Sequence, residues 1–291
     1  MENMKKILSL LLIAFLAIPL LAQDEEEDYP VMWTFETSIL ADNQTVMTPY
    51  KGMMEFQIHH RFGLVTDGHS SLFGIYSPSN IRLGLNYGIT DRIMVGGGAT
   101  KDLSLWDLQG KYAILQQTES GRIPVSLTYY GNMAVEARAD ENFGPPEDFK
   151  FIHKLSYFHQ LIVARKFSEK ISLQLAPTFI YLNAVETGYN NANFGLHAGG
   201  KFTFVPSHSI IVEYDYLFTP PDVDPDGDGT NNFERTKPQF AIGWEKGTPT
   251  HAFHLFFANY KGILGQRNFV YNKNDFWEGE FLVGMNVTVR F

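Results

Sequence analysis

Apolar and polar side chains alternate over the last eleven residues of the chain. The apolar positions share one parity: Phe281, Val283, Met285, Val287, Val289 and Phe291. The opposite parity carries Gly284, Asn286, Thr288 and Arg290, with Leu282 as the one exception. A period of two over this length predicts a β-strand with one apolar and one polar face. The stretch is about as long as a tilted strand must be to cross a bilayer.

Both ends of the chain indicate an exported protein. Two lysines precede an apolar stretch over residues 7–21, and Ala22 is followed by the acidic run 24–28. This order predicts a secretory signal peptide over residues 1–22, cleaved after Ala22. A membrane-anchoring helix would need a longer apolar stretch. At the other end, an aromatic residue that closes an amphipathic strand is typical of the assembly signal of bacterial outer-membrane barrels, and Phe291 is the predicted signal.

Composition narrows the class of protein. The chain has 291 residues, a formal net charge of −9, no cysteine and 14% aromatic residues. Without cysteine it has no disulfide, thiolate metal site or lipidated cysteine. Its acidic balance argues against nucleic acid as a partner. After the signal peptide we predict a periplasmic segment over residues 23–50 and one all-β domain over residues 51–291.

Candidate strands follow Gly52 to the end of the chain, and most have one apolar face. Short turns between them alternate with mostly longer gaps, which is the pattern of outer-membrane barrels with periplasmic turns and external loops. An even number of strands leaves no open edge in lipid. We therefore predict a single up-and-down antiparallel transmembrane β-barrel of about 12 strands. A soluble β-sandwich or lipocalin-like barrel would need a second layer to cover its rows of aromatic side chains.

The polar faces of the predicted strands carry charges of both signs. The residues predicted to line the barrel lumen are Glu55, His59, Arg61, Arg82, Asp107, Lys111, Glu136, His197, Lys201, Glu213, Asp215, Glu245 and Arg290. A barrel of this girth lies between small barrels filled by their own side chains and wide porins. Two interpretations stay open: an interior in which buried ions pair with one another, and a narrow charge-lined pore. The histidines fit a polar network better than a metal site, because their spacing matches no metal motif.

The most specific chemical motif is acidic. Carboxylates at alternate positions resemble the first half of a calcium-binding loop: Asp222, Asp224, Asp226 and Asp228. The pattern then departs from that loop, because Phe233 stands where a carboxylate ligand is needed. A weak calcium site and an acidic, turn-rich external loop both remain interpretations, and no other cofactor is predicted.

Two further segments carry less specific patterns. His69, Ser70 and Ser71 provide a base and hydroxyl groups in one loop, but no third residue is placed to orient the histidine. An outer-membrane esterase or phospholipase is therefore a distant alternative. Residues 31–35 of the predicted periplasmic segment are unusually apolar for a free tail. We expect that segment to dock partly on the barrel mouth rather than form a solvated linker.

Three stretches of the chain resemble a known family. They are residues 51–63, which include Phe56-Gln57-Ile58-His59-His60-Arg61-Phe62-Gly63; residues 81–92, which include Gly88-Ile89-Thr90-Asp91-Arg92; and residues 164–175, where Ala164-Arg165-Lys166-Phe167 leads into Leu173-Gln174-Leu175. In these stretches the chain resembles the uncharacterised outer-membrane β-barrel proteins of Bacteroidota known as domain of unknown function 5777. The resemblance spans roughly residues 34–291 and implies an outer-membrane barrel. It implies no activity, substrate or catalytic residue.

The sequence thus predicts an outer-membrane barrel that is not an enzyme. Our first functional hypothesis is a narrow channel or transporter for small solutes of unknown identity. The second is a non-conducting barrel with a structural or partner-binding role. The predicted partners are outer-membrane lipid, the barrel-assembly machinery and an unidentified periplasmic or outer-membrane protein.

Overall fold

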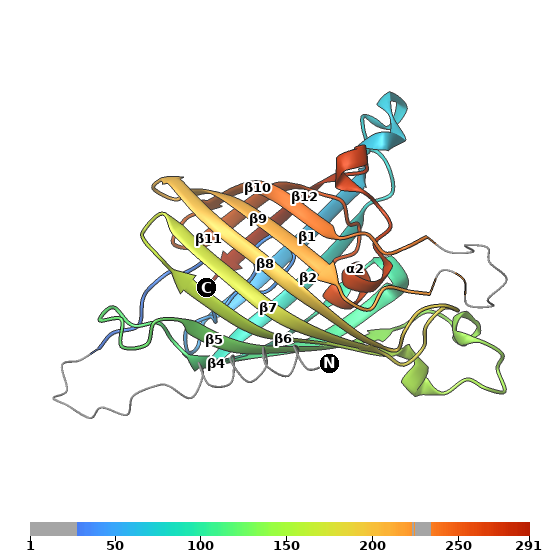
Figure 1. Ribbon diagram of the computed structural model, residues 1–291, viewed down its shortest axis with the longest axis horizontal. Coiled ribbons are helices and arrows are strands. Elements are labelled where there is room, and N and C mark those ends of the chain that lie inside the picture. Colours follow the sequence, from blue (N-terminus) through green and yellow to red (C-terminus); the bar gives the residue numbers. More distant parts are fainter. Residues whose placement is uncertain (1–27, 223, 225–233) are drawn as a thin grey trace, which may run out of the picture.

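Twelve antiparallel strands form a closed barrel in the computed structural model, which describes residues 28–222, 224 and 234–291 (Figure 1). The strands are β1 (Met54–Leu64), β2 (Asn80–Thr90), β3 (Ile93–Thr100), β4 (Leu105–Leu115), β5 (Ser126–Glu136), β6 (Leu155–Lys166), β7 (Ile171–Leu182), β8 (Ala192–Val205), β9 (His208–Leu217), β10 (Gln239–Gly247), β11 (His251–Ala258) and β12 (Leu282–Arg290). Each strand pairs with its neighbours in sequence, and β1 closes the barrel on β12. The predicted up-and-down barrel is confirmed. The signal peptide predicted over residues 1–22 lies outside the described residues.

Side-chain alternation decides which face of each strand turns outward. In β12, Asn286 and Thr288 are fully buried, whereas Met285 between the strand's buried positions stays exposed. Large apolar side chains remain exposed on the outer face of most strands, among them Leu85, Trp106, Leu173, Tyr214 and Leu255. An apolar outer face around a polar interior is the arrangement of a barrel surrounded by lipid.

The tight turns lie at one end of the barrel and most of the long loops at the other, where the short connection between β3 and β4 also lies (Figure 1). The turns after β2, β6, β8 and β10 are tight, and they share an end with the C-terminus. The last long loop contains α2 (Gly265–Tyr271), whose side chains Gln266, Asn268, Phe269 and Val270 are buried. Where the sequence predicts only a long gap, this loop therefore turns back into the barrel. None of the helices in the described part of the chain has the length and apolar character needed to span a membrane.

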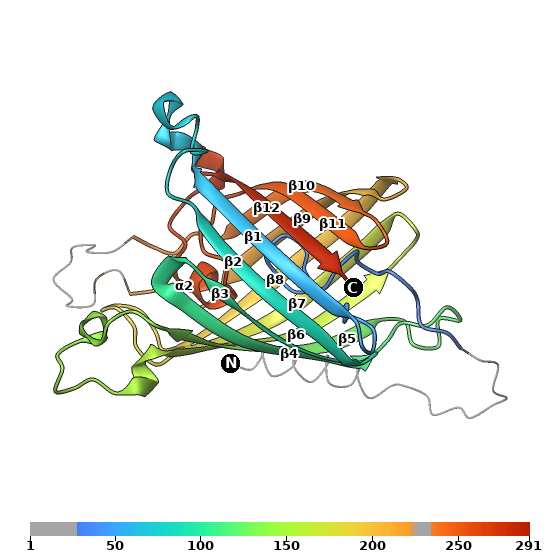
Figure 2. The same ribbon diagram turned by 180° about the vertical axis from the view of Figure 1, so that it is seen from behind.

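The segment before β1 also enters the barrel (Figure 2). Residues 34–46 are buried except for Glu36 and Asp42, which are half-buried, and a backbone bridge between Ile39 and Gln44 closes the tip of this segment into a hairpin. We call residues 34–47 the plug. The expected partial docking on the mouth is an underestimate: insertion extends far beyond the apolar stretch 31–35, whose residues 32 and 33 stay exposed.

The inner wall explains why the plug enters. Barrels of about eight strands are filled by their own side chains, and a wider barrel leaves interior space. The wall from β6 to β9 contributes apolar inward side chains, including Phe158, Ile162 and Ile211, and these form one core cluster with Phe35 and Leu40 of the plug. Covering apolar wall surface removes it from water and stabilises the inserted position of the plug.

Candidate functional site

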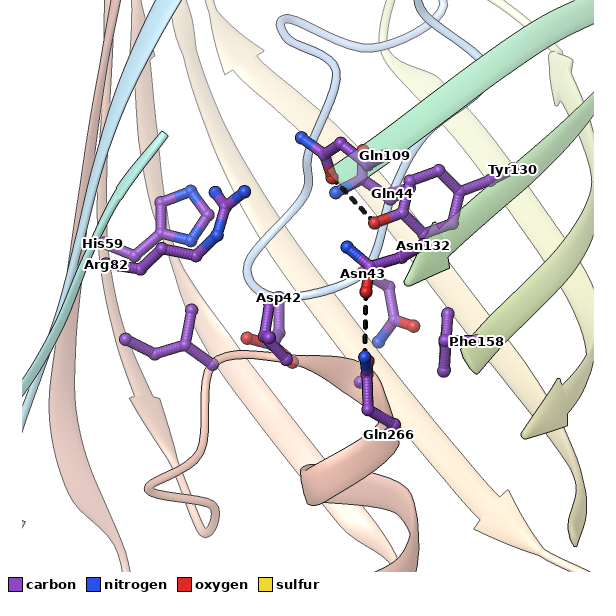
Figure 3. Close-up of a pocket in the computed structure, with 13 residues that line it drawn as sticks. Asp42, Asn43, Gln44, His59, Arg82, Gln109, Tyr130, Asn132, Phe158 and Gln266 are labelled. Carbon is purple, nitrogen blue, oxygen red and sulfur yellow. Dashed lines mark hydrogen bonds between the residues drawn. The ribbon is translucent and has the colours of Figure 1, made fainter. Parts of the chain in front are cut away.

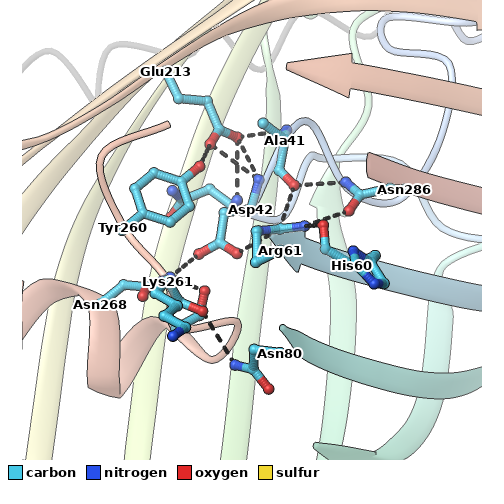
Figure 4. A network of polar contacts seen from close by, with 12 residues as sticks. Ala41, Asp42, His60, Arg61, Asn80, Glu213, Tyr260, Lys261, Asn268 and Asn286 are labelled. Atoms are coloured by element: carbon cyan, nitrogen blue, oxygen red, sulfur yellow. Dashed lines mark hydrogen bonds and ion pairs between the residues drawn. The ribbon is translucent and has the colours of Figure 1, made fainter. Parts of the chain in front are cut away.

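The candidate functional site is the lumen itself, where polar wall residues meet the plug. The carboxylate of Glu213, on β9, accepts hydrogen bonds from three consecutive backbone N–H groups: those of Ala41 at 2.9 Å, Asp42 at 3.0 Å and Asn43 at 3.1 Å (Figure 4). Glu213 is 1% exposed. Convergent N–H donors stabilise a buried carboxylate by charge-assisted hydrogen bonds. Glu213 therefore binds the main chain at the tip of the plug.

Asp42 links the plug to two other elements. Its carboxylate accepts a hydrogen bond from Nη2 of Arg61, on β1, at 3.1 Å and another from Nδ2 of Asn268, on α2, at 2.6 Å (Figure 4). Burial raises the pKa of Asp42 to about 7; the charge of Arg61 opposes this shift, and the charge of Glu213 adds to it. Asp42 therefore titrates near neutral pH while the plug is docked.

The ammonium group of Lys111, on β4, binds the plug from another side of the barrel. It donates to the backbone carbonyls of Ser38 at 2.6 Å, Thr45 at 2.9 Å and Met47 at 3.1 Å. A buried ammonium group is stable only where such acceptors replace its water. Ser38 in turn donates its hydroxyl to the carboxylate of Glu55. Lys111 thus holds both arms of the plug hairpin together.

Further wall residues also reach the main chain of the plug. Asn286 donates to the carbonyl of Ala41 at 2.6 Å, and Gln174 donates to the carbonyl of Gln44 at 3.0 Å. Arg290, near the end of β12, donates to the carbonyl of Glu36. Most hydrogen bonds between the wall and the plug therefore involve the backbone of the plug rather than its side chains.

Most of the remaining charges of the wall pair with one another. Arg82 forms two hydrogen bonds with Asp107, from Nε at 2.8 Å and from Nη2 at 2.7 Å. The other wall pairs are His197 with Asp215 at 2.6 Å, His254 with Glu245 at 3.0 Å, and Arg138 with Glu136. Lys201 is half-buried on the inner face of β8. In this conformation these pairs join basic and acidic side chains of the wall, and the choice between a paired interior and a charge-lined pore stays a prediction.

A cavity of about 20 Å³ lies beside the contact between the tip of the plug and α2 (Figure 3). Gln44, His59, Arg82 and Gln266 are among the residues that line it. This volume holds about one water molecule. Neither ring nitrogen of His59 has a hydrogen-bond partner among the described residues. In the same part of the chain, no group of three or more His, Cys, Asp or Glu side chains is arranged to hold a metal ion.

The two loop motifs have separate outcomes. Asp226 and Asp228 of the predicted calcium site lie outside the described residues, whereas Asp222 is exposed and accepts a hydrogen bond from the backbone of Asp224 at 3.1 Å. The calcium site therefore stays a prediction. His69–Ser71 forms a short 3-10 helix in which the Ser71 hydroxyl donates to a backbone carbonyl at 2.9 Å.

The plug is the functional element that the sequence reasoning largely missed. Its wall partners were predicted from strand parity, but the plug has no period that indicates where it lies. The available signal was a set of apolar residues, Phe35, Ile39 and Leu40, in a segment that a solvated linker would not contain.

Comparison with known proteins agrees with this architecture. The family described as "Membrane bound beta barrel domain (DUF5777)" matches residues 35–291. No curated protein matches the chain. Among solved structures, the chain is similar to the NanC porin, with 6% sequence identity, a TM-score of 0.50, and coverage of 82% of this chain and 98% of that one. It is also similar to the KdgM porin, with 8% identity, the same coverage and a TM-score of 0.45. The NanC likeness shows a shared fold.

Proposed function

We propose that this chain, which belongs to the DUF5777 family of membrane-bound beta barrel domains, is a channel for small solutes that is closed by its own plug. The barrel lies in the bacterial outer membrane, with the tight turns, the C-terminus and the entrance of the plug toward the periplasm. The plug occupies the lumen in the closed state. It leaves the lumen toward the periplasm in the open state.

One observation carries the proposal: the cylinder of strands is complete without the plug. All strand pairs of the barrel join neighbouring strands, and the only backbone bridge within the plug is its internal one between Ile39 and Gln44. The plug is covalently joined to the wall through the residues that lead to Met54, and on its other side Pro30 forms a backbone bridge with Thr118 in the connection between β4 and β5. Its departure therefore breaks side-chain contacts but no strand pairing.

The polar wall is suited to the open state as well. Once the plug has left, Glu213, Lys111 and Arg61 lose their plug partners and line the lumen. Charges of both signs along a water-filled path are the usual lining of a solute or ion pore. The barrel fold shared with the NanC porin is one that can enclose such a path.

A second candidate function is a non-conducting barrel that presents its loops or its periplasmic segment to a partner. The apolar cluster of Phe35, Leu40 and the wall favours this alternative, because a water-filled lumen would expose the wall side of the cluster. The two candidates differ in whether ions ever cross.

Conductance of the full chain in planar bilayers tests the proposal. Leu40→Asp places a charge against the apolar wall, where Leu40 is fully buried, and is expected to open discrete conductance steps that are rare in the wild type. Leu72→Asp makes the same chemical change at an exposed loop residue and should leave the channel closed. If Leu40→Asp assembles as a heat-modifiable barrel and stays silent, the non-conducting alternative replaces the channel.

A further inference from the structure

We infer that the lumen is a binding site for peptides, which it holds through their main chain. The inference rests on the proposed function, because a second peptide can enter only where the plug leaves the lumen. The solute that crosses the channel, or a molecule that blocks it, would then be a peptide, like the plug itself.

The first observation is that side chains on all sides of the wall form hydrogen bonds with backbone groups of the plug. Six inward side chains on six different strands contact main-chain atoms of the plug: Arg61, Lys111, Thr128, Gln174, Glu213 and Asn286. Backbone N–H and C=O groups are the same in every peptide. Contacts of this kind give affinity without requiring the sequence of the plug.

Donors and acceptors of the wall are placed for a peptide chain in particular. Lys111 donates hydrogen bonds to three carbonyls, and the Glu213 carboxylate accepts hydrogen bonds from three N–H groups. A sugar carries neither consecutive N–H donors for Glu213 nor apolar branches for the wall patch that receives Phe35 and Leu40. A peptide carries both.

The second observation is that the wall has hydrogen-bonding capacity that the plug does not use. Gln57, Gln160 and Gln174 each donate through Nε2, to Ser38, Asn43 and the carbonyl of Gln44 respectively. The Oε1 atom of each of these three glutamines is buried and has no hydrogen-bond partner in the part of the chain that the structure describes. Buried polar atoms are normally paired. These three acceptors are available to the N–H groups of another peptide.

The test uses the full-length Leu40→Asp variant, whose plug is weakened while its wall is intact. A fluorescent synthetic peptide with the sequence of residues 34–48 is titrated against the purified barrel, and binding is followed by fluorescence anisotropy. We expect saturable binding. A peptide in which Gln44 and Met47 are alanine should bind within about threefold of the parent, because the wall contacts their carbonyls. If Leu40→Asp does not assemble, Phe35→Ala serves as the weakened plug.

Two matched changes remove a main-chain contact. N-methylation of the Asp42 amide in the peptide removes one donor to Glu213, and a hydrogen bond to a charged group is typically worth enough to weaken binding by about tenfold or more. Glu213→Gln in the barrel should weaken the parent peptide similarly. Ser172 is a buried inward residue of β7 that lies opposite Lys166 and Lys201 on the neighbouring strands. Ser172→Ala should leave binding unchanged.

The outcomes separate the two proposals. Equal binding of the parent and N-methylated peptides, no binding at all, or displacement of the peptide by maltose at the same concentration would overturn the peptide site, even if the variant conducts. Binding with the expected selectivity in a barrel that stays electrically silent supports the peptide site and overturns the channel. Peptide that both binds and blocks the conductance supports both.

Discussion

The carboxylate of Asp42 accepts a hydrogen bond from Nδ2 of Asn268 at 2.6 Å, and this contact joins the two segments that fill the barrel. Asp42 lies at the tip of the plug, which enters from the end with the tight turns. Asn268 lies on α2, which enters from the end with the long loops. A movement of α2 therefore breaks a contact of the plug.

Asn268→Leu, which keeps the size of the side chain but removes the donor, should increase the open probability of the channel, whereas Lys273→Leu in the same loop should not. Equal conductance of Asn268→Leu and wild type would show that α2 does not restrain the plug.

Docking of the plug should depend on pH through Asp42. The docked plug holds Asp42 with a pKa of about 7, against an ordinary value of 3.8, so the docked state binds a proton that the released state gives up between these values. Docking is therefore strongest at low pH and weakens as pH rises toward about 7. The charged groups that face Asp42 are Arg61 of β1 and Glu213 and Asp215 of β9. Open probability should rise from pH 5 to pH 8 in the wild type, and Asp42→Asn should flatten that response. The same pH response in both proteins would show that titration of Asp42 does not cause it.

Breaking the buried pair of Arg82 and Asp107 should destabilise the folded barrel more than replacing both residues. Arg82→Met leaves the carboxylate of Asp107 buried, with the amide of Asn132, at 3.2 Å, as its one remaining donor among the described residues. Loss of one partner of a buried pair typically costs about 3–5 kcal/mol, whereas replacing both by apolar residues costs much less. Arg82→Met should lower the temperature at which the barrel loses its folded mobility on gels. Arg82→Met combined with Asp107→Leu should recover most of that loss, and a double variant as unstable as the sum of the singles would contradict the pairing.

The outer face should reject charge. Leu85, in the middle of β2, is 44% exposed on the apolar outer face. An arginine that faces lipid near the midplane costs about 2–4 kcal/mol. Leu85→Arg should therefore reduce the yield of membrane-inserted, heat-modifiable barrel, while Leu85→Met should not. Equal yields would mean that this face does not contact lipid.

Regular alternation made the barrel predictable, and irregular segments made its contents unpredictable. The parity of β12 follows from residues two positions apart, such as Val287 and Val289, and this short-range pattern is visible in the sequence alone. The bond between Ala41 and Glu213 joins residues separated by 172 positions, in a segment with no period. The α2 helix has only seven residues and no side-chain cap, so its local signal is equally weak. The sequence therefore predicted the inward side chains but not the plug that they bind.

Cross-linking of the plug tests the central claim most directly, because the chain contains no cysteine of its own. Asn43 of the plug donates to the carboxylate of Asp215, on β9, at 2.8 Å. Asn43→Cys together with Asp215→Cys therefore places two thiols within reach of a short, reducible cross-linker, and each single cysteine variant is the matched control. Each substitution removes the contact between Asn43 and Asp215, so without the reagent these variants should open more often than the wild type. We predict that the cross-linked barrel is silent in planar bilayers, that reduction restores the frequent conductance steps, and that the reagent does not close either single variant. A barrel that conducts equally with the plug cross-linked, or that stays silent after reduction, would contradict it.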